Sequence, residues 1–379
     1  MKKIVIASDS FKGSLTSKQV AESIEKGIFN VFPNCVTDKV FIADGGEGTV
    51  DALVETLKGD LITVKVHNPL MRPVHAYYGI IENGTTAIIE TALASGLTLI
   101  AQEERNPMKT TTYGTGELIK DALLRGCRRF LIGIGGSATN DAGTGLLQAL
   151  GYRFFDSTGN ELGKGGEILS KIERIDDSQV IKEIKNSEFI VACDVKNPFS
   201  GKTGASYVFA PQKGADQEMV EMLDAGLKHF AGIVKRYYGI DIDNIPGSGA
   251  AGGMGGGLKA FLNASLVSGI NIVLETIDFE SRIKNADLII TGEGKLDAQT
   301  AMGKAPRGVL EMAQNNNIPV IAIGGSVEAY NELNKQGFTA VFPVLPAPVT
   351  LEKALEPDFA KANIENTITQ IIRIIKNLK

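Results

Sequence analysis

The chain has 379 residues, of which 43% are hydrophobic and 22% are charged, and its formal net charge is −5. This composition is typical of a soluble globular protein, and the length favours two domains. The acidic balance argues against nucleic acid or an anionic membrane as the main partner, because both call for a basic face.

The cysteines and histidines indicate neither a disulfide framework nor a zinc site. They are few, widely separated, and show no CxxC or HExxH spacing, which favours a reducing compartment. The apolar run after Met1 is too short for a signal peptide, and no later stretch approaches the length of a membrane span. We therefore expect a cytoplasmic protein. The residues are Cys35, Cys127, Cys193, His67, His75 and His229.

The opening of the chain alternates between strand and helix patterns. A strand is predicted over 3–7, and Thr16 with Gln19 forms a capping box that opens the first helix. A strand over 36–42, a helix with apolar positions from Val50 to Leu57 and a third strand over 61–66 follow. This order is typical of an α/β fold.

The pattern changes after Asn68. Pro69 and Pro73 interrupt it, and the runs 74–81 and 86–89 are separated by an Asn-Gly pair. That pair is a strong hairpin signal, so we predict two antiparallel strands and a domain boundary near Asn68. A helix over 117–124 then resumes the α/β pattern.

The stretch 129–150 combines a buried strand with a glycine-rich loop. An apolar run over 130–134 ends at Gly135-Gly136-Ser137, and a helical pattern follows. Asn140 or Asp141 is positioned to cap that helix, and the glycines allow backbone N–H groups to turn toward a ligand. The loop is thus a candidate anion site, although an ordinary strand-to-helix turn would have the same pattern.

The rest of the chain returns to plain α/β organisation. Residues 151–187 are polar and are expected to cover the site, and a helix over 216–238 places Met219 and Met222 in the core. From residue 286 onward, strands and helices alternate again. The fold class is therefore α/β, with a discontinuous flavodoxin- or Rossmann-like domain over 1–68 and 282–379 and an α/β domain inserted over 69–281.

Two nucleotide-binding patterns are misleading. Residues 247–252 match GxGxxG, but no buried strand precedes them, and a dinucleotide site needs that strand to aim the helix. Gly201-Lys202-Thr203 ends like a P-loop, but Lys196 stands where the first glycine belongs. Neither segment is assigned a nucleotide.

Acidic and basic side chains recur where the predicted strands end. The carboxyl ends of parallel strands share one edge of a sheet, so these segments should gather around one or two crevices. Phosphoryl transfer needs Mg²⁺ held by hard oxygens, cations on the phosphates and a carboxylate for the acceptor hydroxyl. The side chains are Asp9, Lys12, Asp44, Glu47, Asp194, Lys196, Glu293, Lys295, Asp297 and Lys304.

Eight segments together resemble the bacterial type I glycerate kinases, and they cover the chain from about Ile4 to Gly325 in order. They are SDSFKGSLTS (8–17), ADGGEGT (43–49), TTYGTGELI (111–119), GGSATNDAGTG (135–145), ACDVKNPFSGKTGA (192–205), PQKGA (211–215), PGSGAAGGMGGGL (246–258) and TGEGKLDAQTAMGKAPRGV (291–309).

The resemblance implies ATP-dependent phosphorylation of D-glycerate, usually to 2-phosphoglycerate. It also implies two α/β domains, one flavodoxin-like and discontinuous and the other resembling a restriction-enzyme fold, with the site in the cleft. D-glycerate is then a small-molecule substrate, ATP and Mg²⁺ are required, and a homodimer is left open.

Roles are assigned within these segments by position. Asp194 is expected to orient or deprotonate the acceptor hydroxyl, with Asp297 as the rival and Lys12 as a further catalytic candidate. The candidate metal ligands are Asp44, Glu47, Glu293 and Asp297, although Glu47 could equally serve the helix dipole. The candidate substrate- and nucleotide-binding residues are Ser10, Lys12, Gly135, Gly136, Ser137, Asn140, Asp141, Asn197 and Lys304.

Other functions stay open from the residues alone. A glycerate 3-kinase would share the same groups. A non-catalytic organic-acid sensor would bind glycerate without consuming ATP, although it would gain nothing from the carboxylates. A dehydrogenase is the remaining class, and it would change the absorbance of a reduced nicotinamide.

Overall fold

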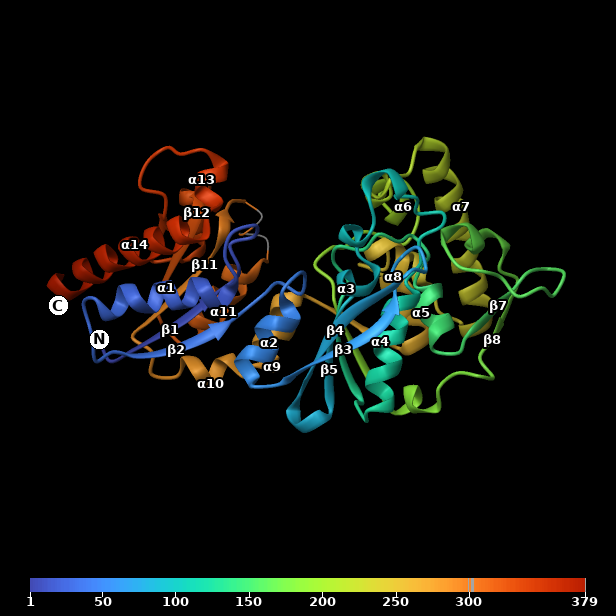
Figure 1. Ribbon diagram of the computed structural model, residues 1–379, viewed down its shortest axis with the longest axis horizontal. Coiled ribbons are helices and arrows are strands. Elements are labelled where there is room, and N and C mark those ends of the chain that lie inside the picture. Colours follow the sequence, from blue (N-terminus) through green and yellow to red (C-terminus); the bar gives the residue numbers. More distant parts are fainter. Residues whose placement is uncertain (299, 301–302, 379) are drawn as a thin grey trace. The chain divides into compact units, whose positions relative to one another are not determined.

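The computed structural model describes residues 1–298, 300 and 303–378. These fall into two compact units. The first unit comprises Met1–Asp44, Asp51–Leu57 and Ile270–Lys379, and the second comprises Gly45–Val50 and Lys58–Gly269. Figure 1 shows the elements of each unit along the chain.

The first unit is built on a five-stranded sheet in which every pairing is parallel. Its strand order is β13-β12-β11-β1-β2, which corresponds to the 2-1-3-4-5 order of flavodoxin-like folds. Successive strands are added to one side of β1 and then to the other, so the strand order reverses between β1 and β11. In such folds ligands bind beyond the carboxyl ends of the strands at this switch point. The strands are β1 (Lys3–Ser8), β2 (Val36–Phe41), β11 (Leu288–Leu296), β12 (Val320–Val327) and β13 (Ala340–Pro343).

The helices of the first unit bury apolar faces that their sequence spacing predicts. The capping box of Thr16 and Gln19 is present, and Val20, Ile24 and Ile28 of α1 are buried. α1 packs against α14, whose Ile364, Ile368 and Ile372 belong to the same core. The helices are α1 (Ser17–Phe29), α2 (Thr49–Leu57), α9 (Gly269–Thr276), α10 (Phe279–Ile283), α11 (Ala305–Asn315), α12 (Tyr330–Gln336), α13 (Leu351–Leu355) and α14 (Pro357–Leu378).

The second unit contains a mixed six-stranded sheet of order β10-β9-β6-β5-β4-β3. The pairings from β5 to β10 are parallel, whereas β3-β4 and β4-β5 are antiparallel. The predicted β4-β5 hairpin is confirmed, with Asn83 at φ 55° in its turn. The strands are β3 (Asp60–His67), β4 (Pro73–Ile81), β5 (Thr86–Glu90), β6 (Arg129–Gly133), β9 (Glu188–Ala192) and β10 (Ser265–Val267).

The unit boundaries differ from those expected from sequence at three places. Residues 45–50 were expected with the first unit, but they belong to the second. Residues 58–68 were expected with the first unit, but β3 pairs along its whole length with β4 and so belongs to the second. Residues 270–281 were expected in the insertion and instead belong to the first unit.

Helices and short 3₁₀ turns surround the second sheet. The helices are α3 (Ala92–Ser95), α4 (Tyr113–Leu124), α5 (Thr144–Ala149), α6 (Ala205–Phe209), α7 (Gln217–Tyr238) and α8 (Ala250–Leu262). The 3₁₀ turns are η1 (Glu82–Gly84), η2 (Leu97–Leu99), η3 (Gln102–Glu104), η4 (Gly166–Lys171), η5 (Lys182–Asn186), η6 (Pro211–Lys213) and η7 (Ile242–Asn244). The region 151–187 also holds a small antiparallel sheet of β7 (Arg153–Phe155) and β8 (Arg174–Asp176).

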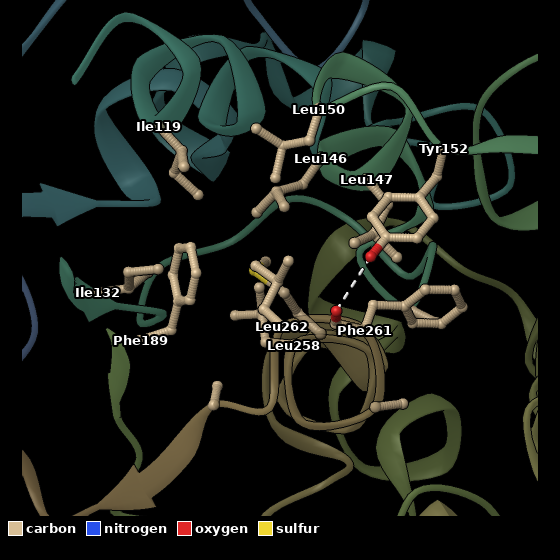
Figure 2. Close-up of a cluster of buried hydrophobic side chains, with 14 of the residues drawn as sticks. Ile119, Ile132, Leu146, Leu147, Leu150, Tyr152, Phe189, Leu258, Phe261 and Leu262 are labelled. Carbon is tan, nitrogen blue, oxygen red and sulfur yellow. Dashed lines mark hydrogen bonds between the residues drawn. The ribbon is translucent and has the colours of Figure 1, made fainter. Parts of the chain in front are cut away.

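The core of the second unit lies between the sheet and helices α4, α5 and α8. Figure 2 shows Ile119, Leu146 and Leu258 converging on this core. The hydroxyl of Tyr152 at its edge donates a 3.0 Å hydrogen bond to the carbonyl of Phe261. Burial of these side chains supplies the main driving force for folding of the unit.

Two expectations for this unit need correction or refinement. Met222 is 53% exposed, so the expectation that both methionines of α7 fill the core is wrong. The segment 247–252 leads into α8 and directly follows the 3₁₀ turn η7 instead of a strand, which agrees with its exclusion as a dinucleotide site.

Candidate active site

Acidic side chains meet in the first unit at the switch point between β1 and β11. Asp9 follows β1 directly, and its backbone N–H donates to the carbonyl of Gly292 in β11 at 2.9 Å. Glu293 is the next residue of β11, so the two carboxyl groups leave neighbouring strands at the edge where ligands bind in such sheets. Both residues are buried.

Asp9 has a strongly perturbed carboxyl group. Burial raises its pKa to about 7, and the charge of Asp44 acts in the same direction. The Lys12 ammonium and the Ser10 N–H oppose this shift, and Glu293 adds to it. A carboxyl that is half-protonated near neutral pH can accept or donate a proton, or it can ionise fully when a cation binds.

Lys12 faces the same group of carboxylates. It lies in a tight turn in which Phe11 and Leu15 exchange backbone hydrogen bonds of 2.9 Å, and Gly13 permits the turn with φ 79°. Its Nζ lies 3.4 Å from Oδ2 of Asp44. Burial acts to lower the pKa of Lys12, but the charges of Asp44 and Asp9 outweigh it and raise the pKa.

Glu293 is held by two neighbours. The hydroxyl of Thr300 donates to its Oε1, and Nζ of Lys304 lies 3.5 Å from its Oε2. Burial raises the pKa of Glu293, while Thr300 and Lys304 act to lower it. Lys304 occupies the N-cap of α11, so that its ammonium is placed beside this strand end.

Asp297 lies just beyond β11 with different partners. Its Oδ2 is 3.7 Å from Nζ of Lys295, which also pairs with Glu328 at 3.0 Å. Its Oδ1 accepts a 3.4 Å hydrogen bond from the N–H of Thr300. Within the described residues, no three His, Cys, Asp or Glu side chains are arranged as a ready metal site.

The loop 135–141 follows β6 in the second unit, and hydrogen bonds to a buried carboxylate stabilise its conformation. Asp141 is fully buried, and its carboxylate accepts hydrogen bonds from the N–H groups of Thr112 (2.8 Å), Gly143 (3.1 Å) and Gly145 (3.3 Å). Burial nevertheless raises its pKa. The N-cap of α5 is Gly143, so the expectation that Asn140 or Asp141 occupies that position is wrong, although Asp141 still binds N–H groups at the start of the helix.

The outward face of this loop is made by its glycines. Gly135 and Gly136 are exposed, whereas Ser137 and Asn140 are buried. The amide of Asn140 donates to the hydroxyl of Ser206 at 3.2 Å. In the part of the chain that the structure describes, no backbone carbonyl accepts from the N–H of Gly135 or Gly136. The glycine backbone is therefore the part of the loop that can meet an anion.

Asp194 and Asn197 follow β9, the neighbour of β6 in the sheet. Asp194 is exposed, and its Oδ1 accepts a 3.0 Å hydrogen bond from the N–H of Gly269. The amide of Asn197 donates to the carbonyl of Thr203 at 2.9 Å, and its own carbonyl accepts from Gly249. Both residues thus lie at the carboxyl edge of the second sheet.

The candidates from sequence therefore form two groups. The first unit brings together Lys12, Asp44, Glu293 and Lys304, with Ser10 and Asp297 nearby in the chain. The second unit holds the exposed Glu47 and the remaining candidates, which are Gly135, Gly136, Ser137, Asn140, Asp141, Asp194 and Asn197.

Three residues beside these groups were given no role from sequence: Asp9, Thr300 and Lys213. Asp9 was noted only as one of the acidic strand-end residues, and its position after an apolar run was the available signal. Thr300 and Lys213 lie in matched segments but offer no local signal of their contacts. Positions 299, 301 and 302 of the last matched segment fall outside the described residues.

Comparison with known proteins decides the family. A family model described as the glycerate kinase family matches residues 4–376. The chain belongs to the glycerate kinase family. Several curated relatives are named for the glycerate kinase activity, so the chain is an enzyme of this family.

Individual family members resemble the chain over nearly its full length. The glycerate kinase of Bacillus cereus (strain ATCC 10987) is 49% identical, over 99% of this chain and 98% of the relative. The glycerate 2-kinase of Escherichia coli (strain K12) is 47% identical over 93% of this chain and 93% of the relative.

A solved family structure confirms the α/β fold. It is the crystal structure of a protein from Salmonella typhimurium LT2, described provisionally as glycerate kinase 2. Its TM-score is 0.92 at 45% identity, with 99% of this chain and 98% of that one covered. Among the described residues, no helix combines the length and the apolar character that crossing a membrane would need.

Proposed function

We propose that this glycerate kinase transfers the γ-phosphoryl group of ATP to the 2-hydroxyl of D-glycerate, giving 2-phospho-D-glycerate and ADP. The observation that carries the proposal is the cluster of Asp9, Asp44 and Glu293 with Lys12 and Lys304 at the β1/β11 switch point. Family membership supports the substrate, and the name of the Escherichia coli relative supports the 2-position.

The two lysines are the groups that would meet the phosphates. Lys12 lies on an exposed turn with 58% of its side chain accessible, and 33% of the Lys304 side chain is accessible. Each carries a compact positive charge that can bind a phosphate oxygen and stabilise the negative charge on it during phosphoryl transfer. Their present partners Asp44 and Glu293 hold them near the switch point until the phosphates arrive.

The carboxylates fit a magnesium ion that arrives with the nucleotide. Asp44 and Glu293 both raise the pKa of Asp9, which shows that negative charges are crowded at this strand edge. A divalent cation relieves such crowding, and Mg²⁺ characteristically takes one or two carboxylates together with substrate phosphates. Asp44 and Glu293 are the ligands we favour, and Glu47 and Asp297 remain candidates. When bound, Mg²⁺ neutralises charge on the transferring phosphoryl.

Glycerate would use groups of the second unit. We assign its carboxylate to the N–H groups of the exposed residues Gly135 and Gly136, because backbone N–H groups in such a turn bind anions without adding a positive charge. Asp194 is assigned to the acceptor hydroxyl, with Asp297 of the first unit as the rival. Oδ1 of Asp194 accepts a hydrogen bond from the N–H of Gly269. A carboxylate that is already oriented loses little entropy when it binds the acceptor hydroxyl.

The deciding experiment is incubation of the protein with ATP, Mg²⁺ and D-glycerate, followed by phosphorus NMR of the product. The expected result is a phosphate ester on the secondary hydroxyl. An ester on the primary hydroxyl would make the protein a glycerate 3-kinase. Binding of glycerate without ADP release would indicate an organic-acid sensor. A change in the absorbance of reduced nicotinamide, measured in a parallel incubation to which it is added, would indicate a dehydrogenase. Each of these three outcomes contradicts the proposal.

A further inference from the structure

Lys213 is a buried lysine outside the groups described so far. It closes the 3₁₀ turn η6, and only 2% of it is exposed. Gly214 follows in a left-handed conformation with φ 95°, and a Cβ there would lie 2.3 Å from the carbonyl of Arg105. This position therefore needs glycine, and the turn it permits directs Lys213 into the interior.

The ammonium group of Lys213 is bonded to the loop after β6. Its Nζ donates to Oγ of Ser137 at 3.0 Å and to the carbonyl of Thr139 at 2.6 Å. Between these two residues, Ala138 is fixed from the other side, because its N–H donates to Ser95 and its carbonyl accepts from the Thr110 hydroxyl. The loop is thus clamped directly beside its exposed glycines.

A buried amine is a costly way to stabilise a fold. Burial lowers the pKa of Lys213 to about 7, and the charge of Asp141 only partly opposes this. An apolar side chain of similar volume often stabilises a core as well as a buried charge does. What the amine adds is two directed hydrogen bonds, so its contribution is to the shape of the loop.

We propose that Lys213 is a positioning residue: its hydrogen bonds to Ser137 and Thr139 fix the loop that presents the N–H groups of Gly135 and Gly136 to an anionic ligand. The loop's ligand is taken from the proposed function, whereas the positioning itself follows from the contacts of Lys213. In the proposed function this anion is the carboxylate of D-glycerate, and a phosphate of ATP is the alternative that the kinetics below distinguish.

The test compares Lys213→Met with Tyr152→Phe. Methionine keeps most of the volume of lysine and removes both hydrogen bonds. Tyr152→Phe removes one buried hydrogen bond in the same unit, to Phe261 and to no residue of the loop, and controls for lost stability. Steady-state kinetics would be measured with D-glycerate and ATP varied separately, and amide hydrogen exchange would be measured on the ligand-free proteins.

We expect Lys213→Met to raise KM for one of the two substrates about ten-fold or more, the size expected when a hydrogen bond to a charged group is lost. The substrate affected identifies the anion. Exchange of the Ala138 N–H, which is protected by its hydrogen bond to the carbonyl of Ser95, should accelerate in this variant, and Tyr152→Phe should change neither quantity. Unchanged exchange would overturn the positioning role, and faster exchange with both KM values unchanged would overturn the link to a ligand.

Ser137→Ala keeps the test decisive if Lys213→Met does not fold. It removes one of the two bonds and leaves the lysine in place, so a smaller rise in KM for the same substrate is expected. Unchanged KM values in Ser137→Ala would overturn the proposal. Where Lys213→Met does fold, the serine change should add little in the double variant, because Ser137 acts through Lys213. Additive effects would overturn the proposal. Absence of glycerate kinase activity in the wild type would count against the proposed function alone, since hydrogen exchange reports the positioning separately.

Discussion

The carboxyl group of Asp9 makes the stability of the protein depend on pH in a direction opposite to that of most acids. Its pKa is raised from 3.8 to about 7, first by burial and then by Asp44. Between these values the folded protein binds the proton more tightly than the unfolded chain does. The free energy of unfolding should therefore fall as pH rises from about 4 to about 7.

Asp9→Asn tests this dependence. Asparagine cannot ionise, and its oxygen can still accept the 2.6 Å hydrogen bond from the N–H of Ser10. At pH 8 the variant should be more stable than the wild type, by at most about 4 kcal/mol. Near pH 4 the two should be alike. Urea unfolding at both pH values measures the difference, and equal stability at pH 8 would show that Asp9 ionises without cost.

Asp194→Asn tests the carboxylate assigned to the acceptor hydroxyl. The hydrogen bond from Gly269 can be kept by the asparagine oxygen, so the fold should be preserved. Loss of general-base assistance should reduce kcat about 10²- to 10⁴-fold, with a smaller effect on KM. Asp297→Asn is the matched comparison. If it proves the more damaging of the two, the role passes to Asp297.

At the scale of elements, the contact between α1 and α14 depends on one glycine. A Cβ on Gly27 would lie 2.7 Å from the carbonyl of Glu365 and 2.8 Å from Cβ of Ile368. Alanine there forces the two helices apart, since close-packed cores do not absorb an extra methyl group. α14 is the last element of the chain, and this contact attaches it to the first unit.

Gly27→Ala should lower the stability of the protein by about 1–3 kcal/mol, as overpacking typically does. Gly232→Ala is the control, because it lies inside α7 and a Cβ there meets nothing within 4 Å. That change should be neutral or stabilising by up to about 1 kcal/mol through helix propensity. Thermal unfolding of both variants gives the comparison. A stable Gly27→Ala would mean that α14 can shift without loss.

Local signals predicted the elements well, and pairing partners were harder to predict. The capping box of α1 and the Asn-Gly turn lie within a few residues of the structure they specify, and both are confirmed. β3 has no such signal, because its alternating pattern suits any neighbouring strand and only the structure shows that it pairs with β4. Met222 shows the same limit, since hydrophobicity alone did not reveal its exposure.

For the molecule as a whole, the strand order explains how much of the site could be anticipated. Parallel strands place their carboxyl ends together, so the sequence could group Lys12, Asp44, Glu293 and Lys304, which the first unit does bring together. The burial of individual polar side chains could not be predicted from the sequence in the same way. Asp9 and Lys213 have pKa values near 7 only because distant segments enclose them, and no local pattern records that.

Removal of magnesium should abolish the activity of the whole molecule without lowering its stability. The folded units are held by apolar cores, whereas of the two favoured ligands Asp44 lies half-buried in the loop after β2 and Glu293 is already paired with Thr300 and Lys304 without a metal. A metal held by such side chains together with nucleotide phosphates contributes to turnover and little to the fold. Excess EDTA should therefore abolish phosphorylation and leave the thermal midpoint unchanged in the absence of ATP, and added Mg²⁺ should restore the rate. A drop in the midpoint with EDTA alone would instead reveal a structural metal.

ATP with Mg²⁺ at 100 times its dissociation constant should stabilise the protein by about 2.7 kcal/mol. EDTA should remove most of this gain, because the lysines alone would then have to bind the triphosphate against the repulsion of the carboxylates around Asp9.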